Sequence, residues 1–191
     1  MQSSFFSMIL RMKYINRWGL MRNTCYETLS QHSLDVAVIA HALAVINNKR
    51  LSGNINPEKA AVYGLFHDVS EIITGDLPTP IKYHDDEMKT AYKQVENASR
   101  KSLLSLLPPD LTPVYGEIFE CEDIEIKKFV KAADKLAGLI KCLDEELVGN
   151  KEFIKAKESQ ISALEELDMP EAQIFMKEFL ESFEMTLDEL R

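Results

Sequence analysis

The sequence has few cysteines, an excess of acidic over basic residues, and no long uninterrupted apolar run. Its three cysteines are widely separated and form no CxxC pair: Cys25, Cys121 and Cys142. This spacing excludes a disulfide framework and a thiolate zinc site. The net charge of −9 disfavours binding to a nucleic-acid polymer, because the protein's field repels phosphates.

The apolar segments are also too short to suggest a membrane protein. The longest run, residues 36–46, is interrupted by His41 and cannot span a bilayer. The first eighteen residues carry charges among their apolar positions and lack a cleavage site of small residues, so they do not read as a secretory signal. We expect a soluble, cytoplasmic protein with no membrane partner.

Alternating strand patterns are nearly absent, and apolar residues recur at helical spacing along the chain. The sequence shows no repeat, low-complexity tract or long linker, which predicts one all-α domain over residues 1–191. The expected helices cover about 5–14, 31–47, 57–75, 85–107, 123–147, 152–167 and 170–183. We expect Ser30 to cap the second helix and Asn56-Pro57 to begin the third.

The segment GLFHDVSEIITGDLPTP, residues 64–80, is unusual because four ionisable residues interrupt a stretch that otherwise looks built for a core. They are His67, Asp68, Glu71 and Asp76. Burying an imidazole beside a carboxylate costs folding free energy unless each group has a hydrogen-bond or ionic partner. We expect His67 and Asp68 late in the third helix, and other parts of the chain must supply their partners.

Two further residues complete a candidate set of metal ligands. His32 lies in the first turn of the expected second helix, and Asp134 interrupts the apolar stripe of the 123–147 helix, which has no arginine. With His67 and Asp68 they form a set of two imidazoles and two carboxylates. Such a set suits Mn, Fe, Co, Ni or Zn and is too rich in nitrogen for Mg or Ca. The alternative is that His32 caps its helix while His67 and Asp68 bond only to each other and to the backbone.

The remaining histidines do not fit this set. His84-Asp85 is a second His-Asp pair, but it lacks apolar flanks and reads as a surface turn. His41 follows His32 by nine residues, which places it about 180° away around a helix. We therefore expect one metal ion per chain.

The pattern H…HD…D in an all-α chain resembles the HD-domain metal-dependent phosphohydrolases. The segments INRWGLMRN, SQHSLDVAVIAHAL, HDVSEIITGDLPTPIKY and KAADKLAGLIKCLDE resemble the bacterial HD-domain 5′-deoxynucleotidases over nearly the whole chain. The resemblance implies an HD-domain helical bundle and a phosphoric monoester hydrolase that releases phosphate from deoxyribonucleoside 5′-monophosphates. It also implies a homodimer and a preference for Co²⁺ or Mn²⁺, with Zn²⁺, Ni²⁺, Cu²⁺ or Fe²⁺ as alternatives.

Three residues around the expected metal site have chemistry that fits this activity. Arg17 could clamp phosphate oxygens, and Trp18, the only tryptophan, could form a wall for a sugar or base. A core tryptophan beside a solvated arginine is the alternative. Glu71 could accept and pass on a proton, or it could be an ordinary surface residue.

The resemblance extends these roles to a defined set of residues. It implies catalytic roles for Glu71, Arg17 and Asp76, and metal binding by His32, His67, Asp68 and Asp134. It implies substrate contact by Arg17, Trp18, His32, Asp68, Asp76, Leu77, Pro78, Thr79 and Asp134. The Arg17-Trp18 pair would orient the phosphate and screen the 2′ position of the sugar.

Two other functions remain compatible with the sequence. One is an HD phosphohydrolase that acts on another phosphate ester or on a nucleoside triphosphate, although no large basic cluster is present to hold a triphosphate. The other is a non-catalytic module that uses the site as a structural staple or nucleotide sensor. A staple needs only metal ligands, so Glu71, Asp76 and Arg17 favour an enzyme.

Overall fold

The structure is a computed structural model that describes residues 2–82 and 84–190, apart from the side chains of Thr79 and Pro80. Within these residues every regular element is a helix, and one isolated β-bridge pairs Asn16 with Thr28. The prediction of an all-α chain is confirmed. The chain forms two compact units: residues 1–21, 26–33 and 66–122, and residues 22–25, 34–65 and 123–191. The expectation of one domain over 1–191 stays a prediction.

The first unit contains short helices and two longer ones. They are α1 (Phe5–Ile9), the 3₁₀ helix η1 (Leu10–Tyr14), α4 (Glu71–Thr74), α5 (Thr79–Lys82), α6 (Asp86–Leu104) and α7 (Thr112–Glu120). The first turn of α2 (Leu29–Arg50) also belongs to it.

The second unit contains the rest of α2 and most of α3 (Pro57–Phe66). Its other helices are α8 (Ile124–Leu147), η2 (Lys151–Phe153), α9 (Ile154–Leu167), α10 (Pro170–Phe179) and η3 (Leu180–Glu184).

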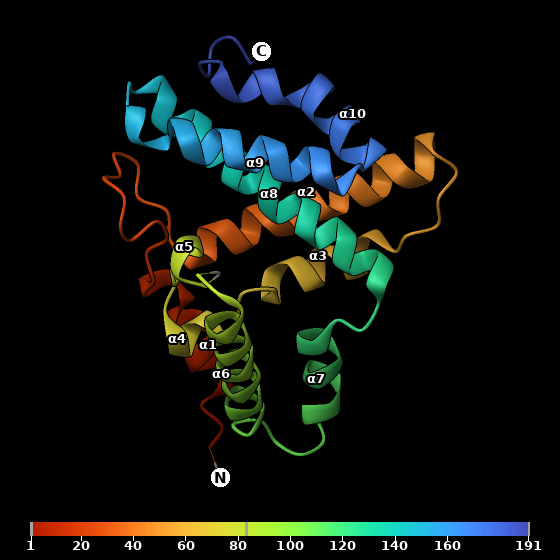
Figure 1. The fold of residues 1–191 in the computed structure, drawn as a ribbon. Helices are drawn as coiled ribbons and strands as arrows, with labels where there is room; N and C mark the ends of the chain where they lie inside the picture. Colours follow the sequence, from red (N-terminus) through yellow and green to blue (C-terminus); the bar gives the residue numbers. More distant parts are fainter. Residues whose placement is uncertain (1, 83, 191) are drawn as a thin grey trace. The chain divides into compact units, whose positions relative to one another are not determined.

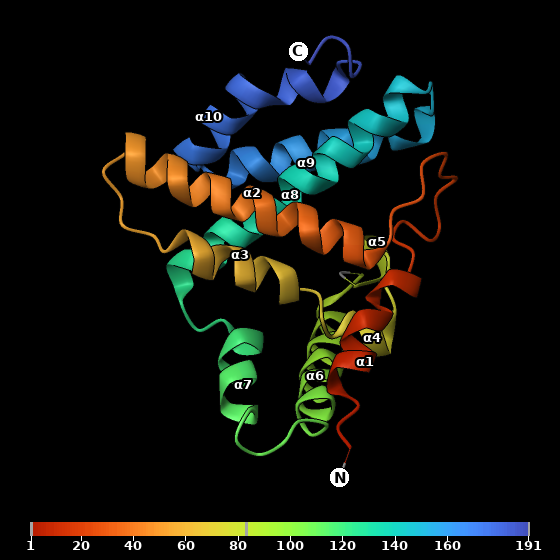
Figure 2. The same ribbon diagram turned by 180° about the vertical axis from the view of Figure 1, so that it is seen from behind.

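An aromatic cluster forms the centre of the first unit. The Phe5 ring of α1 lies 4.9 Å from the ring of Tyr115, and the Phe66 ring lies 5.8 Å from that of Phe119. Val69 is buried in the same cluster, and Figure 2 shows α1, α4 and α6 side by side. Phe66 and Val69 therefore anchor the chain on both sides of His67-Asp68.

Helix α7 was not predicted from the sequence. Gly116 weakens its helix propensity, and the helix spans only 9 residues, with Pro113 in its first turn. Its apolar face, with Tyr115 and Phe119 packed into the aromatic cluster, supplies the stabilisation that its propensity lacks.

Of the two helix starts predicted from the sequence, one is confirmed and one is wrong. Asn56 Oδ1 accepts the Lys59 N–H at 2.8 Å, so the predicted start of α3 is confirmed. The prediction of Ser30 as the cap of α2 is wrong, because the helix begins at Leu29. Thr28 caps it instead, since its hydroxyl accepts the Gln31 N–H at 3.3 Å and the Gln31 side chain accepts the Thr28 N–H at 2.8 Å. This reciprocal pair is a capping box.

The third helix is shorter than the sequence predicts. α3 ends at Phe66, residues 67–70 form a turn, and a separate short helix, α4, begins at Glu71. His67 and Asp68 therefore lie in a turn and not within α3. On a continuous helix adjacent side chains diverge by about 100°, whereas the turn allows both to project to one side.

Helix α8 is the centre of the second unit. It is buried along most of its length, and it runs beside α9 (Figure 1). Elsewhere in this unit α2 and α3 approach closely, because a Cβ placed on Gly64 would lie 2.8 Å from the Cα of Ala37. Glycine is required there by the contact between the two backbones.

Among the described residues, one helix passes a length and composition test for crossing a membrane. This helix is α2, and 56% of its apolar window is buried inside the protein. The core helix of a soluble protein passes the same test, so it is weak evidence for a membrane span.

A buried carboxylate fixes residues 22–25 within the second unit. Glu145 is fully buried, accepts the backbone N–H groups of Thr24 and Cys25 at 3.0 Å and the Asn150 amide at 2.8 Å, and pairs with the buried Lys141. Burial raises the pKa of Glu145, but the hydrogen bonds from Lys141, Thr24 and Asn150 outweigh it, so the pKa lies well below the usual range.

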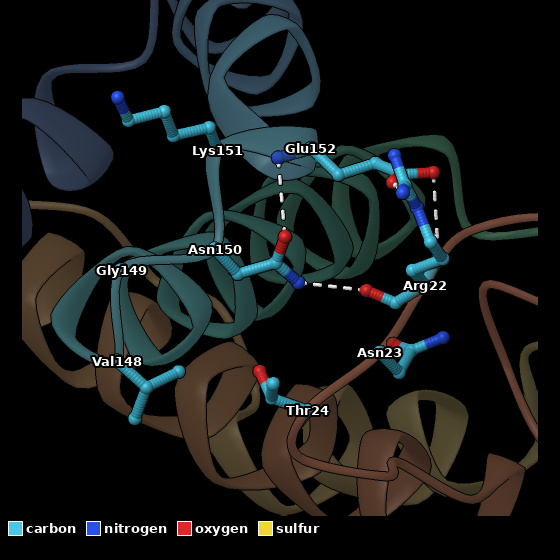
Figure 3. A pocket seen from close by; sticks show the side chains of 8 residues that line it. All are labelled: Arg22, Asn23, Thr24, Val148, Gly149, Asn150, Lys151 and Glu152. Atoms are coloured by element: carbon cyan, nitrogen blue, oxygen red, sulfur yellow. Dashed lines mark hydrogen bonds and ion pairs between the residues drawn. The ribbon is translucent and has the colours of Figure 1, made fainter.

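A hollow of about 410 Å³ lies beside this network, lined by residues 22–24 and 148–152. Figure 3 shows Asn150 linking the Arg22 carbonyl to the Glu152 backbone, with bonds of 2.7 and 3.1 Å. No residue of the sequence-predicted site lines this hollow.

We expect Glu145→Gln to lower the free energy of unfolding at pH 7 by about 3–5 kcal/mol, because it leaves a buried ammonium without its counter-charge. The folded pKa of Glu145 is lowered, so its contribution is complete above the unfolded carboxyl pKa of about 4.3 and declines below it. The difference from wild type, measured by urea unfolding, should therefore narrow as the pH falls from 7 to 3.

Glu146→Gln is the matched control, because Glu146 makes a surface ion pair with Lys157 and such pairs contribute about 0–1 kcal/mol. Equal losses for the two variants, or a Glu145→Gln loss that is independent of pH, would contradict the assignment.

Candidate functional site

His32 is held at the start of α2 by the Thr28 capping box. Its side chain is fully buried, with Nδ1 3.3 Å from Glu27 Oε1 and Nε2 3.8 Å from Asp68 Oδ2. The imidazole therefore lies between two carboxylates. It does not serve as the helix cap, because Thr28 fills that position.

Asp68 Oδ2 is the point at which several polar groups meet. It lies 3.0 Å from His67 Nε2 and accepts a hydrogen bond of 3.3 Å from Arg17. The two imidazole rings are 5.3 Å apart, centroid to centroid. The turn between α3 and α4 thus brings His67 and Asp68 to the first turn of α2.

This cluster fits a transition-metal ion. One ligand atom each from His32, His67 and Asp68 lie within 4.8 Å of one another. Bonds of about 2.0–2.2 Å from nitrogen and oxygen to a metal require ligand atoms about 3 Å or slightly more apart, so small side-chain adjustments suffice. Two imidazoles and a carboxylate are a donor set for first-row transition metals.

The fourth predicted ligand, Asp134, lies on α8 in the second unit. Its Oδ2 is 2.9 Å from Lys135 Nζ, and its side chain is 25% exposed. The carboxylate is therefore partly buried, whereas the sequence interpretation placed it facing the core. Its role as a metal and substrate ligand stays a prediction.

The two histidines set aside from the sequence are exposed. His84 pairs with Asp85 at 3.0 Å in a surface turn, where Asp85 caps α6 by accepting the Met88 N–H. His41 is exposed on α2, whereas His32 on the same helix is buried.

Glu71, the first residue of α4, is buried and not a surface residue. Only 2% of it is exposed, and Oε1 pairs with Lys82 Nζ at 2.5 Å. Its other oxygen, Oε2, is buried without a hydrogen-bond partner among the described residues. Burial and the negative charge of Asp68 raise the pKa of Glu71 to about 7, although Lys82 opposes them.

Arg17 and Trp18 follow η1 and contact the same cluster. The Arg17 side chain is 12% exposed and bonds Asp68, so it is not a solvated residue. Trp18 is half-buried, and its backbone has a φ of 59°. That conformation costs a bulky residue about 1–3 kcal/mol and persists only where the surroundings enforce it.

The turn after α4 supplies one of the groups that hold Trp18. Asp76 Oδ2 accepts the Trp18 backbone N–H at 3.1 Å, and Asp76 Oδ1 lies 4.0 Å from Lys82 Nζ. Gly75, with φ of 72°, ends α4 and allows this turn. Leu77 and Pro78 are half-buried.

Thr79 begins α5, and its side chain lies outside the described part of the structure. The substrate roles of Leu77, Pro78 and Thr79 stay predictions.

Two residues of the site were not predicted from the sequence: Glu27 and Lys82. Glu27 is only 8% exposed and accepts the Trp18 indole N–H at 2.7 Å. Burial raises the pKa of Glu27, but the contacts with His32, Arg17 and Trp18 lower it by more, so the pKa lies below its ordinary value. The position of Glu27 just before a helix cap and five residues before His32 is the one available signal.

Comparison with known proteins gives a consistent result. Residues 4–183 match the family model described as 5′-deoxynucleotidase YfbR-like. A 5′-deoxynucleotidase of Photobacterium profundum is 44% identical over 99% of this chain and 98% of its own. The 5′-deoxynucleotidase YfbR of Shigella boydii is 42% identical over 99% of this chain and 96% of its own.

Solved structures show the same fold. An HD-domain phosphohydrolase from Listeria innocua superposes with a TM-score of 0.82 at 23% identity, covering 94% of this chain and 88% of that one. The HD phosphohydrolase DatZ of cyanophage S-2L, solved with dA and one catalytic Zn²⁺ ion, has a TM-score of 0.63 at 21% identity, with 94% and 96% covered. The predicted HD-domain fold is confirmed.

We expect His67→Ala and Asp68→Ala to lose most of the bound metal, because each removes one of three clustered ligands. His84→Ala is the matched control and should retain the metal, since His84 is the exposed histidine of the second His-Asp pair. Elemental analysis of the purified variants measures the content, which we expect to be one ion per chain in the wild type. Full metal content in the Asp68→Ala protein would overturn the ligand assignment.

Proposed function

The chain belongs to the YfbR-like 5′-deoxynucleotidase family, and we propose that the His32–His67–Asp68 cluster is the centre at which it hydrolyses deoxyribonucleoside 5′-monophosphates to deoxyribonucleosides and phosphate. The observation that carries the proposal is the convergence of three potential metal ligands, Arg17 and a buried Glu71 within one compact unit. A metal site with only a structural role would need the metal ligands alone.

Members of the HD phosphohydrolase group bind a divalent metal, and His32, His67 and Asp68, with Asp134, would hold it here. When bound, such an ion acts as a Lewis acid that activates water and offsets phosphoryl charge. We propose Co²⁺ or Mn²⁺ as the preferred ion, with Zn²⁺, Ni²⁺, Cu²⁺ or Fe²⁺ as alternatives. The support is the mixed nitrogen and oxygen donor set and the family resemblance.

Arg17 is proposed to bind the phosphate. Its guanidinium has five N–H donors in a planar fork, and Asp68 and Glu27 occupy two sides of it, at 3.3 and 3.4 Å. A guanidinium held in this orientation beside the proposed metal ligands can bind phosphoryl oxygens and stabilise the charge that develops on them.

Glu71 is proposed to transfer a proton during hydrolysis. Water attacks phosphorus, the bond between phosphorus and the 5′ oxygen breaks, and a proton passes from the water to the leaving oxygen through Glu71. Lys82 holds Oε1 at 2.5 Å, and the buried Oε2 has no hydrogen-bond partner among the residues that the structure describes. Oε2 is therefore the atom that we assign to the transfer.

Trp18 and the 76–79 turn are proposed to bind the sugar. Trp18 is fixed at its backbone by Asp76 and at its indole nitrogen by Glu27, so its ring is rigid. A rigid aromatic face beside the 2′ carbon excludes a hydroxyl by bulk and offers it no strong acceptor.

We further propose a cytoplasmic homodimer. Its support is the family resemblance and, for the compartment, the small number of cysteines, which are widely separated and form no CxxC pair.

We expect Glu71→Gln to lower kcat by about 10²–10⁴-fold, the usual scale of a proton-transfer residue, while bound metal is retained. Phosphate release from dAMP and metal content of the same samples give the two measurements. Glu87→Gln, on the exposed first turn of α6, is the control and should match wild type. A Glu71→Gln enzyme with normal kcat and full metal would assign Glu71 a structural role.

We expect Trp18→Ala to narrow the preference for dAMP over AMP, because a gap at the 2′ carbon admits the ribose hydroxyl. The measurement is kcat/KM for both nucleotides. Trp18→Phe keeps an aromatic face and should keep most of the preference. An unchanged ratio in Trp18→Ala would place the selectivity elsewhere, in the 76–79 turn.

A further inference from the structure

Glu27 contacts three residues of the proposed site with a single carboxylate. Oε2 accepts the Trp18 indole N–H at 2.7 Å and lies 3.4 Å from Arg17 Nε, while Oε1 lies 3.3 Å from His32 Nδ1. The residue is almost completely buried. A buried carboxylate whose neighbours are all donors is typical of a residue that orients other side chains.

The contact with His32 determines which ring nitrogen can bind a metal. A carboxylate beside Nδ1 favours the hydrogen on that nitrogen, which leaves the Nε2 lone pair available. His32 Nε2 is the atom that lies 3.8 Å from Asp68 Oδ2, on the side of the ligand cluster. Glu27 therefore orients the imidazole in the form that the cluster requires.

The contacts with Trp18 and Arg17 act on the nucleotide side of the site. Trp18 has a left-handed backbone, and the bond from its indole to Glu27 fixes the ring at the other end. Arg17 Nε faces the same carboxylate oxygen, which limits rotation of the guanidinium.

The backbone holds Glu27 opposite these residues. Arg17 N–H bonds the Glu27 carbonyl at 2.9 Å, and the β-bridge between Asn16 and Thr28 lies beside this bond. Leu29 N–H also bonds the Ile15 carbonyl at 2.8 Å. The two chain segments are thus paired antiparallel, which leaves the Glu27 side chain little freedom to leave its three partners.

We propose that Glu27 is a positioning residue that couples the metal ligand His32 to the sugar- and phosphate-binding pair Trp18 and Arg17. The nucleotide half of this proposal rests on the proposed function. The orientation of His32 and of the indole does not, and it can be measured without turnover.

The test uses Glu27→Ala, Glu27→Gln and a matched control. Co²⁺ is titrated into each metal-free protein by calorimetry. Acrylamide quenching of the fluorescence is measured in parallel, and Trp18 is the only tryptophan in the chain. The control is Glu171→Gln, a buried glutamate of the second unit whose hydrogen-bond partner is Asn47. Thermal unfolding by circular dichroism identifies the temperature at which every variant is folded.

In Glu27→Ala we expect Co²⁺ affinity to fall about 10–100-fold, the usual effect of removing a carboxylate that orients a ligating histidine. Quenching of Trp18 should rise. Glu171→Gln should match wild type in both. Glu27→Gln has one amide oxygen and cannot accept from both Trp18 and His32, so it should keep one property and lose the other. Unchanged affinity and quenching in Glu27→Ala, or equal changes in Glu171→Gln, would overturn the proposal.

Kinetics separate this proposal from the proposed function. If wild type releases phosphate from dAMP, Glu27→Ala should lower kcat/KM and narrow the ratio of dAMP to AMP in the same direction as Trp18→Ala. A kcat/KM and a nucleotide ratio both equal to wild type would refute the nucleotide half. If wild type has no activity on dAMP, the proposed function fails, while affinity and quenching still decide whether Glu27 orients His32 and Trp18.

Discussion

The cost of burying charge controls the arrangement of the first unit. Asp68 and His32 are removed from most or all of the surrounding water, and an isolated buried charge is highly unfavourable. Each charged or polar group at the site is therefore held by another: Asp68 by Arg17 and His67, and Glu71 by Lys82. Arg17 and Asp68 are 51 residues apart in sequence, so this pair forms only when distant segments of the unit have come together.

The turn at residues 67–70 shows how apolar packing directs polar chemistry. Phe66 and Val69 enter the aromatic cluster, and the two residues between them have no place in it. Ending α3 at Phe66 removes helical backbone hydrogen bonds at residues 67–70. The packing of Phe66 and Val69 offsets the free energy lost with those bonds. The same turn makes Glu71 the first residue of the short helix α4 and places its side chain in the interior.

Local signals in the sequence were sufficient for much of the fold. The Asn56-Pro57 start of α3, the long amphipathic pattern of α8 and the lack of alternating strand patterns are all properties of neighbouring residues, and they predicted the helices found among the described residues. The HD pair and Glu71 could be proposed because charged residues interrupt an apolar segment, and Arg17 because of its chemistry and the family resemblance. Glu27 and Lys82 could not, because their role depends on contacts across 5 to 11 residues that no periodicity encodes. Helix α7 was missed because tertiary packing, and not propensity, stabilises it.

The charges around the proposed site also determine how its ligands influence one another. Four carboxylates, those of Glu27, Asp68, Glu71 and Asp76, accompany two cationic side chains, Arg17 and Lys82. A phosphate dianion that approaches this excess of negative charge is repelled until a divalent cation reverses the local field. Metal and nucleotide binding are then thermodynamically linked, and each strengthens the other by the same factor. At the proposed site, the metal-free protein would therefore bind a nucleotide more weakly than the metal-bound protein.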